Sequence, residues 1–126
     1  MECPKCHAEM TVVRVEEIEV DRCDRCGGLW FDRREAAVLL ETDPAAAAAI
    51  DTGPSWQAAI HNQQGKTFCP RDGTLMRRLA VPDRPGLAVE RCPACEGTFF
   101  DAGEFSRLTD REIGMLVRAS GGYRAP

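Results

Sequence analysis

The stretch that decides the fold is Cys23-Asp-Arg-Cys-Gly-Gly-Leu-Trp-Phe-Asp32, which follows Cys3-Pro-Lys-Cys6 in this chain of 126 residues. A CxxC turn offers two sulfurs from one backbone bend, and Zn²⁺ takes four such ligands in a tetrahedron. Sixteen residues separate the two pairs, which is enough for a β-hairpin that brings them together. The predicted ligands of this first site are Cys3, Cys6, Cys23 and Cys26.

The cysteine usage favours metal over disulfides. The chain has seven cysteines, an odd number, and most of them stand in short CxxC pairs. A unit of about forty residues rarely buries enough apolar surface to fold unaided, so a bound metal would supply the missing stability. Because four cysteines leave no open coordination position, we expect a structural zinc ion at the first site.

The same pattern recurs downstream in altered form. Cys3–Cys6 reappears 66 residues later as Cys69-Pro-Arg-Asp72, and Cys23–Asp32 reappears 69 residues later as Cys92–Asp101. The difference of three residues falls in one place, the turn between two alternating apolar stretches. That turn is Glu16-Glu17 in the first unit and Pro82–Gly86 in the second. Insertions in a turn cost little, so the repeat predicts two related units.

Each unit is expected to contain a hairpin and a short helix. Val13, Val15, Ile18 and Val20 alternate as in two half-buried strands, and the matching residues of the second unit are Leu79, Val81, Leu87 and Val89. Asp and Glu in capping-box spacing follow each cysteine pair, at 32 and 35 and at 101 and 104. These signals predict helices over about 33–41 and 102–108, and a third box at 109 and 112 predicts a further helix to about residue 119.

The connector from residue 42 to 67 is also expected to be partly helical. Asp43-Pro44 followed by five alanines is a strong helix start, and Trp56, Ala59 and Ile60 share one helical face. The predicted fold is therefore a small metal-stabilised α+β protein made of two zinc-ribbon hairpin units. Its expected boundaries are 1–41, 42–67, 68–119 and a flexible tail at 120–126.

Asp72 makes the second site ambiguous, because it stands where the fourth cysteine is expected. Aspartate is a legitimate zinc ligand, so the first interpretation is a weaker three-cysteine, one-aspartate site. The second is that the metal is lost and the unit survives on aromatic packing. The third is a three-cysteine metal with water or substrate in the fourth place, which would permit Lewis-acid chemistry. The candidate ligands are Cys69, Asp72, Cys92 and Cys95.

The aromatic residues after each cysteine pair have two interpretations. They could stack on bases, but in units this small they more simply form most of the core. The adjacent glycines are expected to allow positive φ and close backbone approach at the turns. The aromatics are Trp30, Phe31, Phe99 and Phe100, and the glycines are Gly27, Gly28 and Gly97.

The charge balance counts against a general nucleic-acid coat. Sixteen basic and twenty acidic residues give a net charge of −4, whereas non-specific binding to nucleic acid depends on neutralising phosphates. Basic residues nevertheless gather around the first cysteine turn, where they either offset thiolate charge or meet phosphates or an acidic partner. Arg22 belongs to this cluster, and the predicted nucleic-acid contacts are Arg25, Arg33 and Arg34.

Nothing in the sequence indicates a membrane protein. No apolar run approaches the roughly 18 residues of a membrane span. The cysteine motif begins directly after Met1-Glu2, which leaves no room before it for a signal peptide. We therefore expect a cytoplasmic protein.

The motifs CPKC and CDRCGGLWFDRRE closely resemble the bacterial TFIIB-type zinc-finger family, small zinc ribbons with CPxC followed by CxxCGGxWxDxxE. CPRD and CPACEGTFFDAGE look like a divergent second copy. The resemblance implies metal binding by the matching cysteines of both units. It also suggests transcription, although a shared ribbon does not establish a shared function.

Three functions remain open at this point. The leading hypothesis is a non-catalytic tandem-ribbon adaptor that presents its turns and helix faces to another protein, in transcription or a related assembly. The second is a nucleic-acid-binding regulator that uses the basic cluster. The third is thiol or zinc-dependent chemistry at the second site, which requires an accessible, low-pKa thiol.

Overall fold

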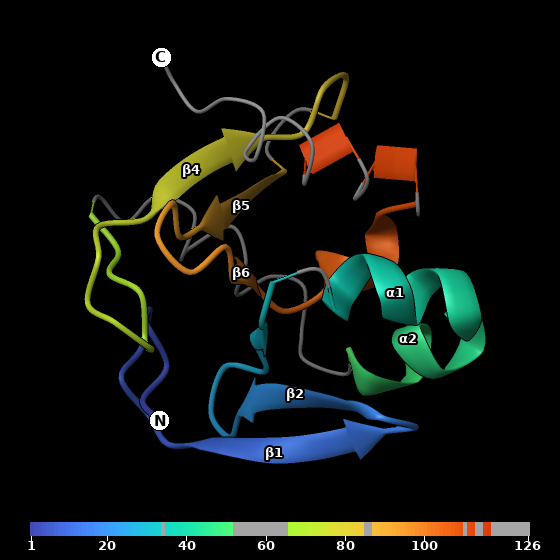
Figure 1. Cartoon of the computed structure of the whole chain (residues 1–126), viewed down its shortest axis with the longest axis horizontal. Coiled ribbons are helices and arrows are strands. Elements are labelled where there is room, and N and C mark those ends of the chain that lie inside the picture. Colours follow the sequence, from blue (N-terminus) through green and yellow to red (C-terminus); the bar gives the residue numbers. More distant parts are fainter. Residues whose placement is uncertain (34, 52–65, 85–86, 110, 113–114, 117–126) are drawn as a thin grey trace.

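The computed structural model describes residues 1–33, 35–51, 66–84, 87–109, 111–112 and 115–116. Their centre is a single antiparallel sheet in the order β1-β2-β3-β6-β5-β4. Helices pack beside it, as Figure 1 shows. The strands are β1 (Met10–Val15), β2 (Ile18–Cys23), β3 (Leu29–Phe31), β4 (Arg77–Ala80), β5 (Ala88–Arg91) and β6 (Thr98–Phe100). The labelled helices are α1 (Glu35–Thr42), α2 (Pro44–Ile50) and the 3₁₀ helix η1 (Phe105–Arg107). Residues 111–112 and 115–116 are also helical, within the range predicted for the last helix.

Both predicted hairpins are present. β1 pairs with β2 from Met10↔Cys23 to Val15↔Ile18, so the two-residue turn at Glu16 and Glu17 closes it directly. In the second unit β4 pairs with β5, and the longer turn is closed by a hydrogen bond from Val81 N to Leu87 O of 2.9 Å. The extra residues therefore leave the strand pairing of the second unit intact, as expected for an insertion in a turn.

The aromatic stretches form a third strand in each unit, and these two strands pair with each other. The register is Leu29↔Phe100, Trp30↔Phe99 and Phe31↔Thr98. Because Trp30 and Phe99 are the same position of the repeat, the two units are related by an approximate two-fold axis through this pair. The pairing joins the two copies into one six-stranded sheet, which the sequence did not predict.

Alternation along β3 and β6 places an apolar core on each face of the sheet. Phe31 and Phe100 lie on the helical face, where their rings meet edge to face at 5.6 Å and both contact Phe105. Trp30 and Phe99 lie on the other face, among the cysteines of both units. All these rings are buried, so the core interpretation of the aromatics is confirmed.

The first helices agree with the predicted signals. α1 begins at Glu35, two residues later than expected, and ends at Thr42. α2 follows almost at once, because the Asp43 carboxylate accepts a 3.0 Å hydrogen bond from Ala46 N and Pro44 occupies the first turn. The second connector helix, predicted around Trp56 to Ile60, lies outside the described residues. Among the described helices, none combines the length and apolarity needed to cross a bilayer.

The helix predicted over 102–108 is wrong in type and extent, since only the short 3₁₀ helix η1 forms there. Gly103 has a φ of +86°, a left-handed conformation that interrupts a regular helix. Asp51, at the end of α2, accepts 2.8 Å hydrogen bonds from the backbone N–H groups of Gly103 and Ser106. A contact from outside the unit thus takes the place of helical hydrogen bonds.

The capping boxes are formed to different extents. At the third box, Glu112 N donates to Thr109 Oγ1 and Thr109 N donates to Glu112 Oε1, so both halves are present. At the second box, Asp101 N donates to Glu104 Oε1, but the Asp101 carboxylate binds Lys5 of the first unit. The local spacing predicted Asp101 as a helix cap, but in the structure its carboxylate forms an ion pair with Lys5.

Candidate metal centres

Each of the four cysteine turns closes in the same way. The residue four positions after the first ligand has a left-handed backbone, and its N–H donates to the carbonyl of that ligand over 2.9–3.2 Å. Gly27, with φ of +78°, confirms the expected need for positive φ, whereas Gly28 and Gly97 do not have it. The four left-handed residues are His7, Gly27, Gly73 and Glu96.

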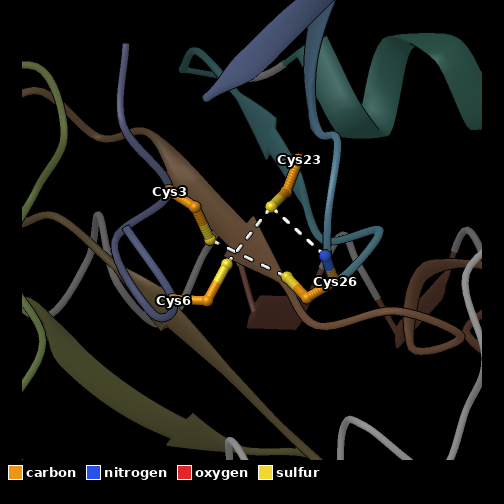
Figure 2. Close-up of side chains that lie close together, drawn as sticks. All are labelled: Cys3, Cys6, Cys23 and Cys26. Carbon is orange, nitrogen blue, oxygen red and sulfur yellow. Dashed lines mark hydrogen bonds between the residues drawn. The ribbon is translucent and has the colours of Figure 1, made fainter. Parts of the chain in front are cut away.

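The first site brings all four predicted cysteines together. Figure 2 shows their side chains converging on one point, and all four sulfurs lie within 4.8 Å of one another. The Sγ atoms of Cys3 and Cys26 are 3.8 Å apart, and those of Cys6 and Cys23 are 3.4 Å apart. A tetrahedron with Zn–S bonds of about 2.3 Å has edges of about 3.8 Å, so the cluster fits Zn²⁺.

Backbone N–H groups surround the sulfurs of the first site. Arg25 N and Cys26 N lie 3.4 and 3.3 Å from Cys23 Sγ, and Gly28 N lies 3.4 Å from Cys26 Sγ. Such donors stabilise thiolates and orient them toward a metal. The turn therefore supplies a second layer of polar contacts as well as the ligands.

The thiols of the first site oppose one another's ionisation when no cation shares their charge. The hydrogen bond from Cys26 lowers the pKa of Cys3 to about 5, and the same interaction strongly raises the pKa of Cys26. Burial raises the pKa of Cys6 to about 11. One thiolate forms readily, but four require a divalent cation, so zinc binding must release protons.

The second site brings together Cys69, Asp72, Cys92 and Cys95, again with ligand atoms within 4.8 Å of one another. Cys69 Sγ lies 3.7 Å from Cys95 Sγ, and Asp72 Oδ1 lies 3.6 Å from Cys92 Sγ. For Zn–S and Zn–O bonds of about 2.3 and 2.1 Å, the tetrahedral S···O separation is about 3.6 Å. This cluster also fits Zn²⁺, and coordination by Asp72 itself stays a prediction.

Asp72 differs from the ligands around it in exposure and charge. Cys69 and Cys92 are buried and Cys95 is half-buried, but Asp72 is exposed. Its carboxylate accepts a 2.9 Å hydrogen bond from Thr74 N, and this bond lowers the pKa of Asp72. By contrast, burial raises the pKa of Cys69 to about 12. The second site thus offers one preformed, solvent-facing anion beside two thiols, Cys69 and Cys95, whose pKa values are raised by burial.

Between the two sites, each unit inserts an aromatic ring against a glycine of the other. A Cβ added at Gly97 would lie 2.1 Å from Trp30 Cζ2, and one added at Gly28 would lie 2.3 Å from Phe99 Cζ. Close approach of the backbone to sulfur was predicted at these glycines, and Gly28 N lies 3.4 Å from Cys26 Sγ, but the approach of an aromatic ring was not predicted. Space for a ring from the other repeat copy is the physical reason that glycine is needed at both positions.

Two reciprocal ion-pair clusters also join the units. Lys5 Nζ of the first unit lies 3.2 Å from Glu90 and 3.0 Å from Asp101 of the second. Its repeat counterpart, Arg71, reaches back to the first unit, where its guanidinium lies 3.3 Å from Asp21 and 2.8 Å from Asp32. The sequence analysis did not predict either cluster. A signal was present, because the repeat conserves the charge at each of the three positions: Lys5 corresponds to Arg71, Asp21 to Glu90, and Asp32 to Asp101.

The two clusters differ in burial. Lys5 is fully buried, and burial raises the pKa of Glu90 to about 7 against the opposing effect of the Lys5 charge. In the other cluster the Arg71 side chain is 44% exposed and hydrogen bonds with Asp32 raise its pKa. Solvent screens exposed pairs, so the Lys5 cluster is the stronger constraint on the two units.

Two of the three basic residues predicted to contact nucleic acid belong to the described part of the chain, and both are exposed. Arg25 is exposed, and Arg33 is exposed with Glu96 3.9 Å away. Arg22 donates a 3.4 Å hydrogen bond to Ile50 O at the end of α2, which is a structural role. Arg34 lies outside the described residues. Nucleic-acid binding by this cluster stays a hypothesis.

Fold and sites together define a tandem zinc-ribbon protein with two metal-binding clusters on one face of a shared sheet. Residues 2–42 and 68–111 match the model of the transcription factor zinc-finger family, which has the TFIIB type of zinc ribbon. These two segments cover more than half of the chain, and the chain belongs to this family. Comparison with curated proteins gave no match, and comparison with solved structures gave none either.

Proposed function

We propose that this protein is a non-catalytic zinc-binding adaptor that presents its ribbon surfaces to another protein, within transcription or a related assembly. The observation that carries the proposal is the closed first site. Four cysteine sulfurs lie together at distances that suit one zinc ion, and an ion bound by all four would have no position open for substrate. A metal held in this way acts on the structure of the surrounding surface and not on a reactant.

The connection between the two units supports the same function. Ring insertion, paired strands and two ion-pair clusters hold both ribbons in one arrangement. A fixed arrangement lets surfaces from both ribbons contact a partner together without the entropic cost of ordering them first. The family is described as a transcription factor zinc finger, and this description supports a partner that belongs to transcription.

Affinity capture followed by binding measurements tests the proposal. The full chain, tagged and expressed at its native level, should enrich a protein that then binds the purified zinc-loaded chain in a calorimeter. Cys3→Ser is the matched control, because loss of a buried ligand should remove the zinc-dependent surface and the binding. Capture that enriches nothing beyond an equally acidic control protein would contradict the adaptor function.

A further inference from the structure

One pair of surface residues differs sharply between the two repeats. Glu2 bridges Glu9 beside the first cysteine turn of the first unit, and Phe68 bridges Leu75 at the same repeat positions in the second. Phe68 is 52% exposed and Leu75 is 47% exposed. Paired in one short β-bridge, they form a contiguous apolar patch and are not isolated surface side chains.

The fold places Phe68, one member of this apolar pair, beside Glu2 of the first unit. A depression of about 360 Å³ lies between the first turns of the two units, here called the turn groove. Its walls come from Glu2, Pro4 and His7 on one side and from Phe68 and Pro70 on the other. Figure 1 shows the start of the chain next to the segment that begins at residue 66.

We propose that the turn groove binds an extended segment of a partner protein in which an apolar side chain is flanked by lysine or arginine residues. The apolar side chain would cover Phe68 and Leu75, and the flanking cations would meet Glu2 and Glu9. The inference rests on the adaptor function and names the chemistry of its partner.

The negative charge beside the turn groove favours a basic segment of a partner protein over a second copy of the chain. Glu2 and Glu9 are both highly exposed, and the whole chain carries a net charge of −4. The N-terminal amine lies 3.7 Å from Glu9 and His7 lies 3.8 Å from Glu2, and solvent screens both of these long contacts strongly. A second copy would bring like charge to the groove, whereas a basic segment brings opposite charge.

Labelled peptides test the proposal with the full zinc-loaded chain. The first probe alternates leucine and phenylalanine with lysine, the second replaces lysine with glutamate, and the third replaces the apolar residues with serine. Fluorescence anisotropy should show that the first peptide binds at least about tenfold more tightly than the other two. Its affinity should also fall as salt rises, because exposed charges contribute to binding.

Matched variants locate the binding. Phe68→Ser and Glu2→Lys should each weaken binding of the basic apolar peptide about fivefold or more. Val12→Ser and Val38→Ser remove other exposed apolar side chains, on β1 and α1, and should leave the affinity unchanged. Zinc content and unfolding of all four variants should match those of the wild type, since the altered side chains are exposed.

Several outcomes would overturn the proposal. They are equal binding of the glutamate peptide, equal loss of affinity in Val12→Ser, and a dimer in sedimentation that Phe68→Ser dissociates. The last result would assign the patch to a second copy. Failure of the adaptor function is distinguishable, because a captured partner that still binds Phe68→Ser contradicts only the turn groove.

Discussion

The two ribbons share their turns and hairpins but differ in what they expose to solvent. The first has four cysteine ligands, a buried lysine that reaches into its neighbour, and two glutamates beside its first turn. The second has an exposed aspartate in its cluster of candidate ligands, a half-exposed arginine in place of the lysine, and an apolar pair in place of the glutamates. The same backbone pattern thus carries a buried lysine and four cysteines in the first copy, whereas the second copy exposes the aspartate and the arginine that replace two of these residues.

Of the changes that test this difference between the ribbons, removing a buried cysteine of the first site should cause the largest loss of stability. We expect Cys26→Ser to lose one zinc ion and most cooperative unfolding, because structural zinc contributes about 10–16 kcal/mol in zinc-finger peptides at neutral pH. Elemental analysis and circular dichroism measure both quantities. A variant that keeps its zinc and its unfolding transition would contradict the structural role of the first site.

The ion-pair clusters offer the next largest contrast. Lys5→Met leaves the carboxylates of Glu90 and Asp101 without their buried cation, and we expect the free energy of unfolding to fall by about 3–5 kcal/mol. Arg71→Met removes the half-exposed counterpart and should cost at most about 1 kcal/mol. Chemical denaturation of both variants checks the difference, and equal losses would show that burial does not separate the two clusters.

Ring insertion between the units should give a smaller but site-specific effect. In Gly97→Ala the new methyl group meets the buried ring of Trp30, so we expect a loss of about 3 kcal/mol in stability and a shift in tryptophan fluorescence. Gly73→Ala is the control, because a methyl group added there would have no atom within 4 Å and only the positive φ opposes the change. It should lose about 1 kcal/mol and keep the fluorescence unchanged.

Substitutions at Asp72 should change metal affinity at the second site with little effect on the first. If its carboxylate is a ligand, Asp72→Ala should lower the zinc affinity of that site by about 10–100-fold, and Asp72→Cys should raise it. Competition with a chelator resolves the two sites. Identical affinities in all three proteins would remove Asp72 from the ligand set and support water in the fourth position.

Much of the candidate site could be predicted from the sequence because its determinants are local. The spacing within each cysteine turn, the two-residue alternation of the hairpins and the cap at Asp43 act over a few residues. The helix expected over 102–108 failed for the opposite reason. Asp51, about fifty residues earlier in the chain, accepts hydrogen bonds from the backbone N–H groups of Gly103 and Ser106. Capping signals depend on neighbouring residues only, so they could not predict this long-range contact.

The sequence by itself determined the four-cysteine cluster of the first site, the repeat and the family, since each depends on residue types at short fixed separations. Only the tertiary structure decided how the copies meet. Pairing of β3 with β6 aligns Trp30 with Phe99, directs each ring at the other copy's glycine, and sets Lys5 and Arg71 among the opposite copy's carboxylates. The turn groove follows from the same pairing, because its two walls are more than sixty residues apart in the sequence and belong to one surface only once the sheet has closed.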